Sequence, residues 1–306
     1  MKRDFLTLKD WSTDELKSMI QTAIRLKAEN KNGITHHHLA GKKLAMIFEK
    51  PSTRTRVSFE VGMYELGGHA LYLSSDDIQL GRGETVKDTA RTLSRFVDGI
   101  MIRTKGHDII EELAENADVP VINGLTDDFH PCQVMADVQT IYEHMNTFDV
   151  KVAYIGDGNN MAQSWLYGAA KFGMDISVAS PENYECDPAV VKSAVEAAKQ
   201  TGAKIELCRD PFDAVKNADI IYTDVWASMG QESEKEERKK IFAGYQVNKK
   251  LMEATGRKTL FMHCLPAYMG LEVTEDVYES DISIVWDEAE NRLHAQKAVM
   301  LKVMGS

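Results

Sequence analysis

The sequence predicts an α/β protein of two domains, each a mostly parallel sheet flanked by helices. Short apolar segments typical of strands alternate with longer segments of helical periodicity along the 306 residues. This alternation restarts after residues 146–148, where a new apolar segment begins. Strands joined through helices form parallel sheets, and a chain of this length has room for two cores. We therefore expect one domain over residues 1–147 and a second over residues 148–288.

The elements of the first domain follow from periodicity and from helix start and stop signals. Ser12 and Glu15 form a capping pattern, and the apolar residues after them recur at helical spacing to about Lys31. Gly67 and Gly68 end a later helix. The expected helices are 12–31, 57–66, 85–96, 109–117 and 133–145, and the expected strands are 43–48, 70–73, 99–103 and 119–122.

The second domain opens with an apolar strand that runs into a glycine turn. Its expected strands are 150–156, 175–179, 204–208, 220–223, 259–262 and 282–285, and its expected helices are 161–172, 189–201 and 211–215. The charged run 232–240 is expected to form a solvated face. The last segment, about 289–306, is predicted to be helical and to pack back on the first domain.

The composition excludes several classes of function. Apolar content of 43% and charged content of 27% are ordinary for a soluble globular protein, and the net charge of −11 argues against nucleic acid as a partner. No apolar run approaches the roughly 18 residues of a membrane span, and the N-terminus lacks an apolar signal core. The 4 cysteines, none of them in a CxxC pair, do not form a disulfide framework. A cytoplasmic location is the simplest expectation.

Residues 51–60, P-S-T-R-T-R-V-S-F-E, carry the strongest local signal. They lie between an expected strand and an expected helix, and a helix N-terminus favours an oxyanion. Ser52, Thr53 and Thr55 add hydroxyl donors, while Arg54 and Arg56 offer planar forks that match phosphate. The pattern predicts a phosphate pocket. The alternative is a helix cap followed by surface arginines.

Polar residues also follow other expected strands, and ligands of open α/β sheets bind at such strand ends. Arg103 ends one strand, where it would be either a ligand contact or a surface residue. His130 and Gln133 start a helix; a histidine can donate to an oxyanion, and an amide can both donate and accept. A capping histidine with an exposed glutamine is the alternative. Asp224 precedes a glycine-ended loop and is suited to an ammonium group.

Three other patterns are weaker signals. Residues 156–160, G-D-G-N-N, lack the third glycine of a dinucleotide fingerprint, so NAD is disfavoured and the asparagines are interpreted as an amide cluster. His263 and Cys264 follow the expected strand 259–262, and adjacent side chains on an extended strand point to opposite faces, so a thiol nucleophile activated by this histidine is disfavoured. Residues 36–38, three histidines in a polar turn, have no second ligand cluster, so no metal site is expected.

Four segments together resemble the aspartate/ornithine carbamoyltransferase family over essentially the full length, and its ornithine-using branch most closely. They are S-T-R-T-R at 52–56, H-P-C-Q at 130–133, D-V-W-A-S-M-G at 224–230 and H-C-L-P at 263–266. The resemblance implies a two-domain fold, no metal and no organic cofactor. It also implies a homotrimer, or a multiple of trimers, with active sites at subunit interfaces. Residues 1–147, with 289–306, would bind carbamoyl phosphate, and residues 148–288 would bind ornithine.

The resemblance also implies the residues of each site by their positions. Those for carbamoyl phosphate are Ser52, Thr53, Arg54, Thr55, Gln79, Arg103, His130, Pro131, Cys132, Gln133, Cys264, Leu265 and Arg292. Those for L-ornithine are Asn160, Asp224, Ser228 and Met229. Catalytic roles would fall to Arg54, Thr55, Arg103, His130, Asp224 and Cys264. Gln79 would reach the site of a neighbouring subunit.

The implied reaction transfers the carbamoyl group of carbamoyl phosphate to the side-chain amine of L-ornithine and gives L-citrulline and phosphate, as in arginine biosynthesis. Direct attack through a tetrahedral intermediate needs donors at the carbonyl oxygen and groups that position the amine. Two rivals stay open: a putrescine carbamoyltransferase, and a non-catalytic regulatory protein of the same fold. The sequence leaves the physiological direction open.

Overall fold

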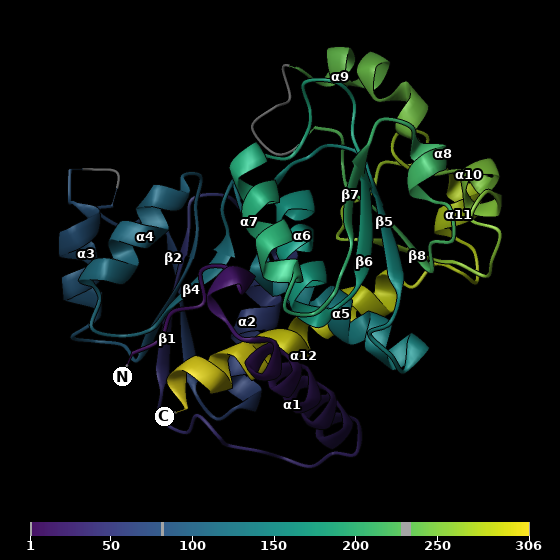
Figure 1. Cartoon of the computed structure of the whole chain (residues 1–306). Coiled ribbons are helices and arrows are strands. Elements are labelled where there is room, and N and C mark those ends of the chain that lie inside the picture. Colours follow the sequence, from purple (N-terminus) through teal and green to yellow (C-terminus); the bar gives the residue numbers. More distant parts are fainter. Residues whose placement is uncertain (1, 81–82, 228–233, 306) are drawn as a thin grey trace. The chain divides into compact units, whose positions relative to one another are not determined.

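The computed structural model describes residues 2–80, 83–227 and 234–305. The chain divides into two compact units (Figure 1). The first unit combines Met1–Gln139 with Glu290–Ser306, and the second is Thr140–Ala289. The C-terminal residues thus return to the first unit, as predicted. None of the helices formed by the described residues is both long and apolar enough to cross a membrane.

The first unit is built on a four-stranded parallel sheet in the order β2-β1-β3-β4. Its strands are β1 (Lys43–Phe48), β2 (His69–Ser74), β3 (Gly99–Arg103) and β4 (Val121–Leu125). Phe48 pairs with Arg103, so the carboxyl ends of β1 and β3 lie side by side. The chain leaves these two strands toward opposite edges of the sheet. Such a switch point is where open α/β sheets bind ligands.

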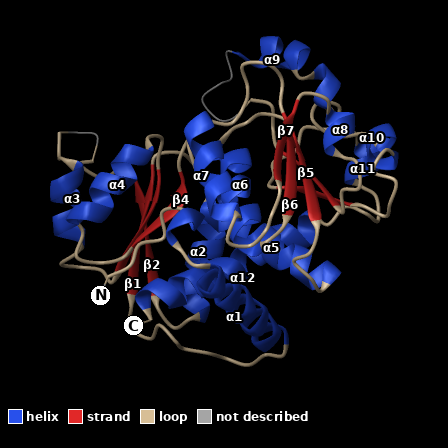
Figure 2. Cartoon of the chain, in the orientation of Figure 1, coloured by secondary structure: helices blue, strands red, loops and turns tan. Residues whose placement is uncertain are grey.

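Helices cover both faces of this sheet (Figure 2). They are α1 (Thr13–Lys31), α2 (Thr53–Glu65), α3 (Val86–Leu93), α4 (His107–Asn116), α5 (Pro131–Met145) and α12 (Val285–Met304), with a short 3-10 helix, η1 (Leu8–Asp10). On one face, α3 and α4 share an apolar cluster with β1 and β3. On the other face, α12 packs closely on α2. Gly62 of α2 leaves room for Met300 of α12, since a Cβ at Gly62 would lie only 2.9 Å from Cε of Met300. The C-terminal helix is therefore part of this core.

The second unit contains a five-stranded parallel sheet in the order β7-β6-β5-β8-β9. Its strands are β5 (Lys151–Ile155), β6 (Asp175–Ala179), β7 (Ile205–Cys208), β8 (Ile220–Thr223) and β9 (Leu260–His263). Ile155 pairs with Thr223, so the ends of β5 and β8 form the corresponding switch point of this sheet.

The helices of the second unit also lie on both faces of its sheet (Figure 2). They are α6 (Asn160–Phe172), α7 (Pro188–Ala198), α8 (Pro211–Ala214), α9 (Lys235–Ile241), α10 (Lys249–Glu253) and α11 (Glu275–Tyr278), with a 3-10 helix, η3 (Ala243–Tyr245). Trp165 of α6 meets Tyr222 of β8 edge-on, with 5.5 Å between ring centroids. On the opposite face, Val215, Leu251 and Val277 pack in one apolar cluster with the strands.

Two sequence predictions differ from the structure. The expected strand 282–285 is wrong: its backbone makes two hydrogen bonds with Phe261, too short a pairing for a strand, and α12 already begins at Val285. The helix expected from residue 57 begins at Thr53, because Ser52 caps it. Cap chemistry therefore places the first turn of α2 within the arginine-rich segment.

Gly158 shows why a glycine is needed in the turn after β5. Its amide donates to the carbonyl of Tyr184 at 2.8 Å. A Cβ at this position would lie 2.2 Å from the backbone nitrogen of Cys186. The glycine therefore allows two backbone segments to approach each other, which accounts for it without a bound dinucleotide.

This packing predicts that Gly158→Ala destabilises the second unit by about 2–3 kcal/mol, because backbone cannot move aside as a side chain can. Gly244→Ala is the matched control, since a Cβ at Gly244 would meet no atom within 4 Å. Thermal unfolding of both variants tests this. Equal melting temperatures for the two variants would contradict the close-packing argument.

Candidate active site

The switch point of the first sheet carries the start of α2. Ser52 is the N-cap, and its hydroxyl accepts a hydrogen bond from the amide of Thr55 at 3.3 Å. Thr53 and Arg54 form the first turn, which follows β1 directly through residues 49–52. The amides of this turn and the positive end of the helix dipole favour a negatively charged group. The local fold thus places a helix N-terminus where the sequence predicted a phosphate pocket, and anion binding at this position stays a prediction.

Arg292 of α12 connects this turn to α5. Its guanidinium donates to Oε1 of Gln133 at 2.7 Å, to the hydroxyl of Thr55 at 3.2 Å and to Oε1 of Gln296 at 2.8 Å. Gln133 in turn donates through Nε2 to Asp137 at 2.8 Å. All five side chains are buried. Each is therefore held in one orientation, which is what a pre-organised site requires.

His130 lies at the start of α5 and is buried. Burial holds the pKa of His130 well below its usual 6.5, and the charges of Arg292, Arg103 and Arg54 lower it further. The imidazole is therefore neutral at neutral pH and keeps one N–H donor. Arg103, which ends β3, is buried beside it. The structure thus brings Arg54, Arg103, His130 and Arg292 into one positively charged cluster.

Other residues singled out in the first domain lie apart from this cluster. Arg56 stacks over Tyr72, with 3.8 Å from its guanidinium carbon to the ring centroid, and forms an ion pair with Glu60. The thiol of Cys132 donates to a backbone carbonyl in the core, and burial raises its pKa to about 12. Gln79 is exposed on the segment after β2. Among the described contacts, none joins Gln79 to the arginine cluster of its own chain.

The switch point of the second sheet carries a hydrogen-bonded carboxylate. Asp224, directly after β8, accepts from Nδ2 of Asn159 at 3.0 Å, from the thiol of Cys264 at 3.0 Å and from the amide of Val225 at 2.7 Å. Asn160, the neighbour of Asn159, begins α6. The structure therefore joins Asp224 to Cys264 by a hydrogen bond and places Asn160 next to Asn159, which also bonds to Asp224. Ser228 and Met229 lie outside the described residues.

Asn159 was predicted as part of an amide cluster but was not among the predicted substrate-binding residues, and the structure makes it a functional candidate. Its Oδ1 caps α6 by accepting from two backbone amides and also accepts from the hydroxyl of Tyr154 at 3.1 Å. With Oδ1 occupied in this way, its Nδ2 is directed at Asp224. The signal in the sequence was present, because an asparagine between a strand–glycine turn and an apolar helix is a typical N-cap.

Within residues 2–80, 83–227 and 234–305, Asp224, His263 and Cys264 form a group that could hold a metal ion, with ligand atoms within 4.8 Å of one another. Each is already hydrogen-bonded: Nδ1 of His263 accepts from the amide of Leu265 at 2.9 Å, and the thiol donates to the carboxylate. A metal would have to displace both bonds. The arrangement therefore fits a hydrogen-bonded site better than a metal centre.

A buried ion pair fixes the turn between β5 and α6. Nη1 of Arg238 lies 2.6 Å from Oδ2 of Asp157 and also donates to the carbonyl of Trp226. Burial raises the pKa of Asp157, and the charge of Arg238 opposes this shift. Asp157 is thus occupied within the protein. Together with the packing of Gly158, this supports the interpretation that residues 156–160 are not a dinucleotide-binding turn.

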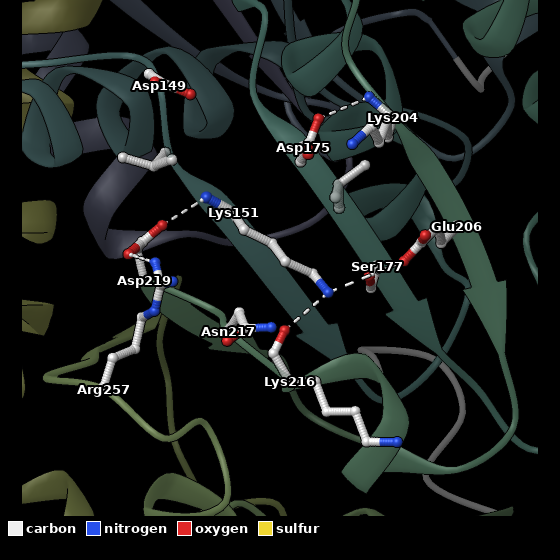
Figure 3. Close-up of a pocket in the computed structure, with 12 residues that line it drawn as sticks. Asp149, Lys151, Asp175, Ser177, Lys204, Glu206, Lys216, Asn217, Asp219 and Arg257 are labelled. Carbon is white, nitrogen blue, oxygen red and sulfur yellow. Dashed lines mark hydrogen bonds and ion pairs between the residues drawn. The ribbon is translucent and has the colours of Figure 1, made fainter.

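A polar cavity of about 440 Å³ lies elsewhere in the second unit (Figure 3). It is lined at the amino ends of the strands, where Lys151 begins β5 and Asp175 begins β6. Lys151 donates to a backbone carbonyl at 3.0 Å, and Arg257 pairs with Asp219 at 2.7 Å. Asp224 follows the carboxyl end of a strand, so this cavity lies at the opposite end of the strands. Lys151 and Arg257 in its wall contact other groups of the protein and so contribute to the structure of the second unit.

Comparisons with known proteins identify the family and the fold of the chain. Residues 3–143 match the model of the aspartate/ornithine carbamoyltransferase carbamoyl-P binding domain, and residues 148–303 match the Asp/Orn binding domain of the same family. The chain is 57% identical to an ornithine carbamoyltransferase of Thermococcus kodakarensis over 99% of this chain and 96% of the relative. The solved ornithine carbamoyltransferase of Pyrococcus furiosus matches with a TM-score of 0.97 and 57% identity, covering 100% and 98% of the two chains. That of Campylobacter jejuni matches with a TM-score of 0.93 and 46% identity, covering 99% of both chains. The chain belongs to the aspartate/ornithine carbamoyltransferase family.

Proposed function

We propose that this protein transfers the carbamoyl group of carbamoyl phosphate to the side-chain amine of L-ornithine, giving L-citrulline and phosphate. The observation that carries the proposal is the cluster of Arg54 with the buried Arg103 and Arg292 around a neutral His130, beside the N-terminus of α2. A phosphate ester with an adjacent carbonyl group fits such a cluster. The second substrate is proposed from the Asp224 site and from relatives that are named ornithine carbamoyltransferases.

In this proposal the phosphate of the substrate binds the first turn of α2. Ser52, Thr53 and Arg54 would supply hydroxyl, amide and guanidinium donors. Thr55, Arg103 and His130 would donate to the carbonyl oxygen, where negative charge grows during the reaction. A neutral His130 suits this role, because it donates a hydrogen bond without surrendering a proton. Residues 52–56 and 130–133 both lie within the part of the chain that matches the carbamoyl-P binding domain of the family.

The remaining predicted contacts orient the carbamoyl group. Gln133 has its amide fixed between Arg292 and Asp137, so its oxygen and its nitrogen cannot exchange places. We propose that Gln133 and the backbone carbonyl of Leu265 accept from the carbamoyl NH2. Pro131 would start α5 at the correct point, and Cys132 would contribute through its backbone, since its thiol faces the core.

Asp224 and Cys264 are proposed to position the ornithine amine. An ammonium group has no lone pair, so it must lose a proton before attack. Once the ammonium has lost this first proton to solvent, the nitrogen forms a bond to the carbamoyl carbon. The bond from that carbon to the phosphate oxygen then breaks, and the second proton of the nitrogen passes to the leaving group, which departs as hydrogen phosphate. The carboxylate would hold the amino group while the thiol, already bonded to Asp224, lies beside it. Asn160, Ser228 and Met229 are proposed to bind the rest of ornithine.

The two rival functions are less well supported. A non-catalytic protein would not need the arginine cluster and the Asp224 site together. A putrescine enzyme would not need residues for an α-amino acid, and the reported relatives carry the ornithine name. The Pyrococcus furiosus relative is named anabolic. We propose the same biosynthetic direction for this protein.

The direct test is citrulline formation by the purified protein from carbamoyl phosphate and ornithine, with putrescine assayed in parallel. We expect turnover with ornithine to exceed that with putrescine by at least about a hundredfold, because a buried site left with unpaired polar groups rejects the smaller amine. Preferred use of putrescine would replace the proposal with its first rival. The absence of turnover with either amine would favour the non-catalytic rival.

Arg54→Ala should weaken carbamoyl phosphate binding by about 2–3 kcal/mol, since a charge-assisted contact to phosphate is lost. Arg25→Ala is the matched control, because Arg25 pairs with Glu29 at 2.6 Å on the exposed face of α1. Isothermal titration calorimetry measures both affinities. If Arg54→Ala binds carbamoyl phosphate as tightly as the unaltered protein does, the proposed contact between Arg54 and the phosphate is wrong.

We also propose that the protein is a homo-oligomer, a trimer or a multiple of trimers. The first unit exposes apolar side chains on α2 and β2: Val57, Val61, Tyr64, Leu71 and Tyr72. Those on α2 recur at helical spacing, and Tyr64 is 80% exposed. Exposed apolar side chains on neighbouring elements often mark a surface that contacts another subunit. Gln79 follows β2, which suits its proposed role at a neighbouring subunit's site.

Sharing of sites between subunits predicts complementation. Gln79→Glu should inactivate by placing a negative charge near the anionic substrate, and Arg54→Ala should inactivate the pocket itself. Co-refolding equal amounts restores about a quarter of the sites, because each site then pairs a random pocket with a random neighbour in a closed ring. Activity of the co-refolded mixture, compared with unmixed parents, measures this. Recovery no greater than the parents would place Gln79 outside the site.

A further inference from the structure

His263, the last residue of β9, and Glu272, in the segment that follows this strand, form a buried pair. Both side chains are completely buried. Nε2 of His263 lies 3.3 Å from Oε1 of Glu272, and the same oxygen accepts from the amide of Tyr268 at 2.5 Å. The pair thus connects the two ends of residues 263–272. Cys264 and Leu265 lie between them.

The hydrogen bonds define where the proton of His263 is. Nδ1 faces the amide of Leu265 at 2.9 Å, and an amide can only donate. Nδ1 must therefore be the unprotonated nitrogen, which places the proton on Nε2 toward Glu272. A lone pair occupied in this way is not available to take a proton from the thiol of Cys264. The histidine is consequently not the base of a thiol–imidazole pair.

Leu265 needs this support because of its backbone. Its φ of 60° lies in the left-handed region, which costs free energy for any residue with a side chain. Such a conformation persists where the surroundings fix it, and it is concentrated at functional sites. The bond from the Leu265 amide to Nδ1 is the direct restraint. The residue before it, Cys264, has its thiol on Asp224 at 3.0 Å.

We propose that His263 and Glu272 are positioning residues that hold the Cys264–Leu265 turn in its reactive conformation. His263 restrains the Leu265 amide, and Glu272 restrains the imidazole and the Tyr268 amide. Together they direct the thiol to Asp224 and fix the direction of the Leu265 carbonyl. The effect on turnover rests on the function proposed above, whereas the tautomer and the turn do not.

Two substitutions of His263 separate positioning from proton transfer. His263→Asn places an amide oxygen near the position of Nδ1 and can still accept from Leu265. His263→Gln reaches toward Glu272 but leaves the Leu265 amide without its acceptor. We expect kcat to fall about a hundredfold in His263→Gln and no more than about tenfold in His263→Asn. The KM for carbamoyl phosphate should change little in either. Equal, large losses of kcat in both variants would overturn the positioning role.

Nuclear magnetic resonance of the unaltered protein, with His263→Asn used only to assign the signals, tests the same proposal without a measurement of activity. In a ¹⁵N-histidine-labelled sample, the imidazole signals that disappear in His263→Asn belong to His263. We expect its Nδ1 to show the shift of an unprotonated nitrogen and its Nε2 that of a protonated one. A proton on Nδ1 would overturn the proposal, even if His263→Gln fails to fold. Failure to form citrulline, with this tautomer observed, would instead reject only the proposed function.

Discussion

The first unit depends on satisfying one buried cation. Arg292 is 2% exposed, and a guanidinium in that position is tolerated only when its donors find acceptors. The acceptors come from three helices: Thr55 of α2, Gln133 of α5 and Gln296 of α12 itself. Each of these bonds also fixes a side chain at or beside the predicted pocket. The contacts that allow Arg292 to be buried therefore also hold the pocket residues in place.

The second unit solves a corresponding problem with a carboxylate. Asp224 is buried at a strand end, and Asn159, Cys264 and the Val225 amide donate to it. In each sheet the site thus forms where the chain reverses its direction across the sheet, with Phe48 beside Arg103 in one and Ile155 beside Thr223 in the other. Parallel topology brings these positions together before any side chain is chosen. The chemistry then follows from cationic residues in one unit and an anionic residue in the other.

The sequence predicted most of this arrangement because strand ends and helix starts are local signals. The alternation of elements, the cap at Ser12, the start of β8 and the returning C-terminal helix all followed from periodicity and capping. The position of residues 52–55 and 130–133, each between a strand and a helix, also followed from these signals.

What could not be predicted are interactions between residues far apart in sequence. The pairing of Arg292 with Gln133, the stacking of Arg56 on Tyr72 and the closure of His263 on Glu272 depend on packing. The expected strand at 282–285 failed because its apolar residues enter the core from a turn, and periodicity alone does not distinguish the two.

The return of α12 to the first unit has a consequence for biosynthesis. Domains generally fold as the chain emerges from the ribosome, N-terminal first. Here residues 1–139 leave the ribosome without Arg292, without Met300 against Gly62 and without the side chain of Met304, which packs on Gly99. The nascent first unit therefore lacks part of its core, and lacks Arg292, until α12 has been translated. The pocket proposed for carbamoyl phosphate is completed only after the second unit has been synthesised, although the sheet of the first unit is made first.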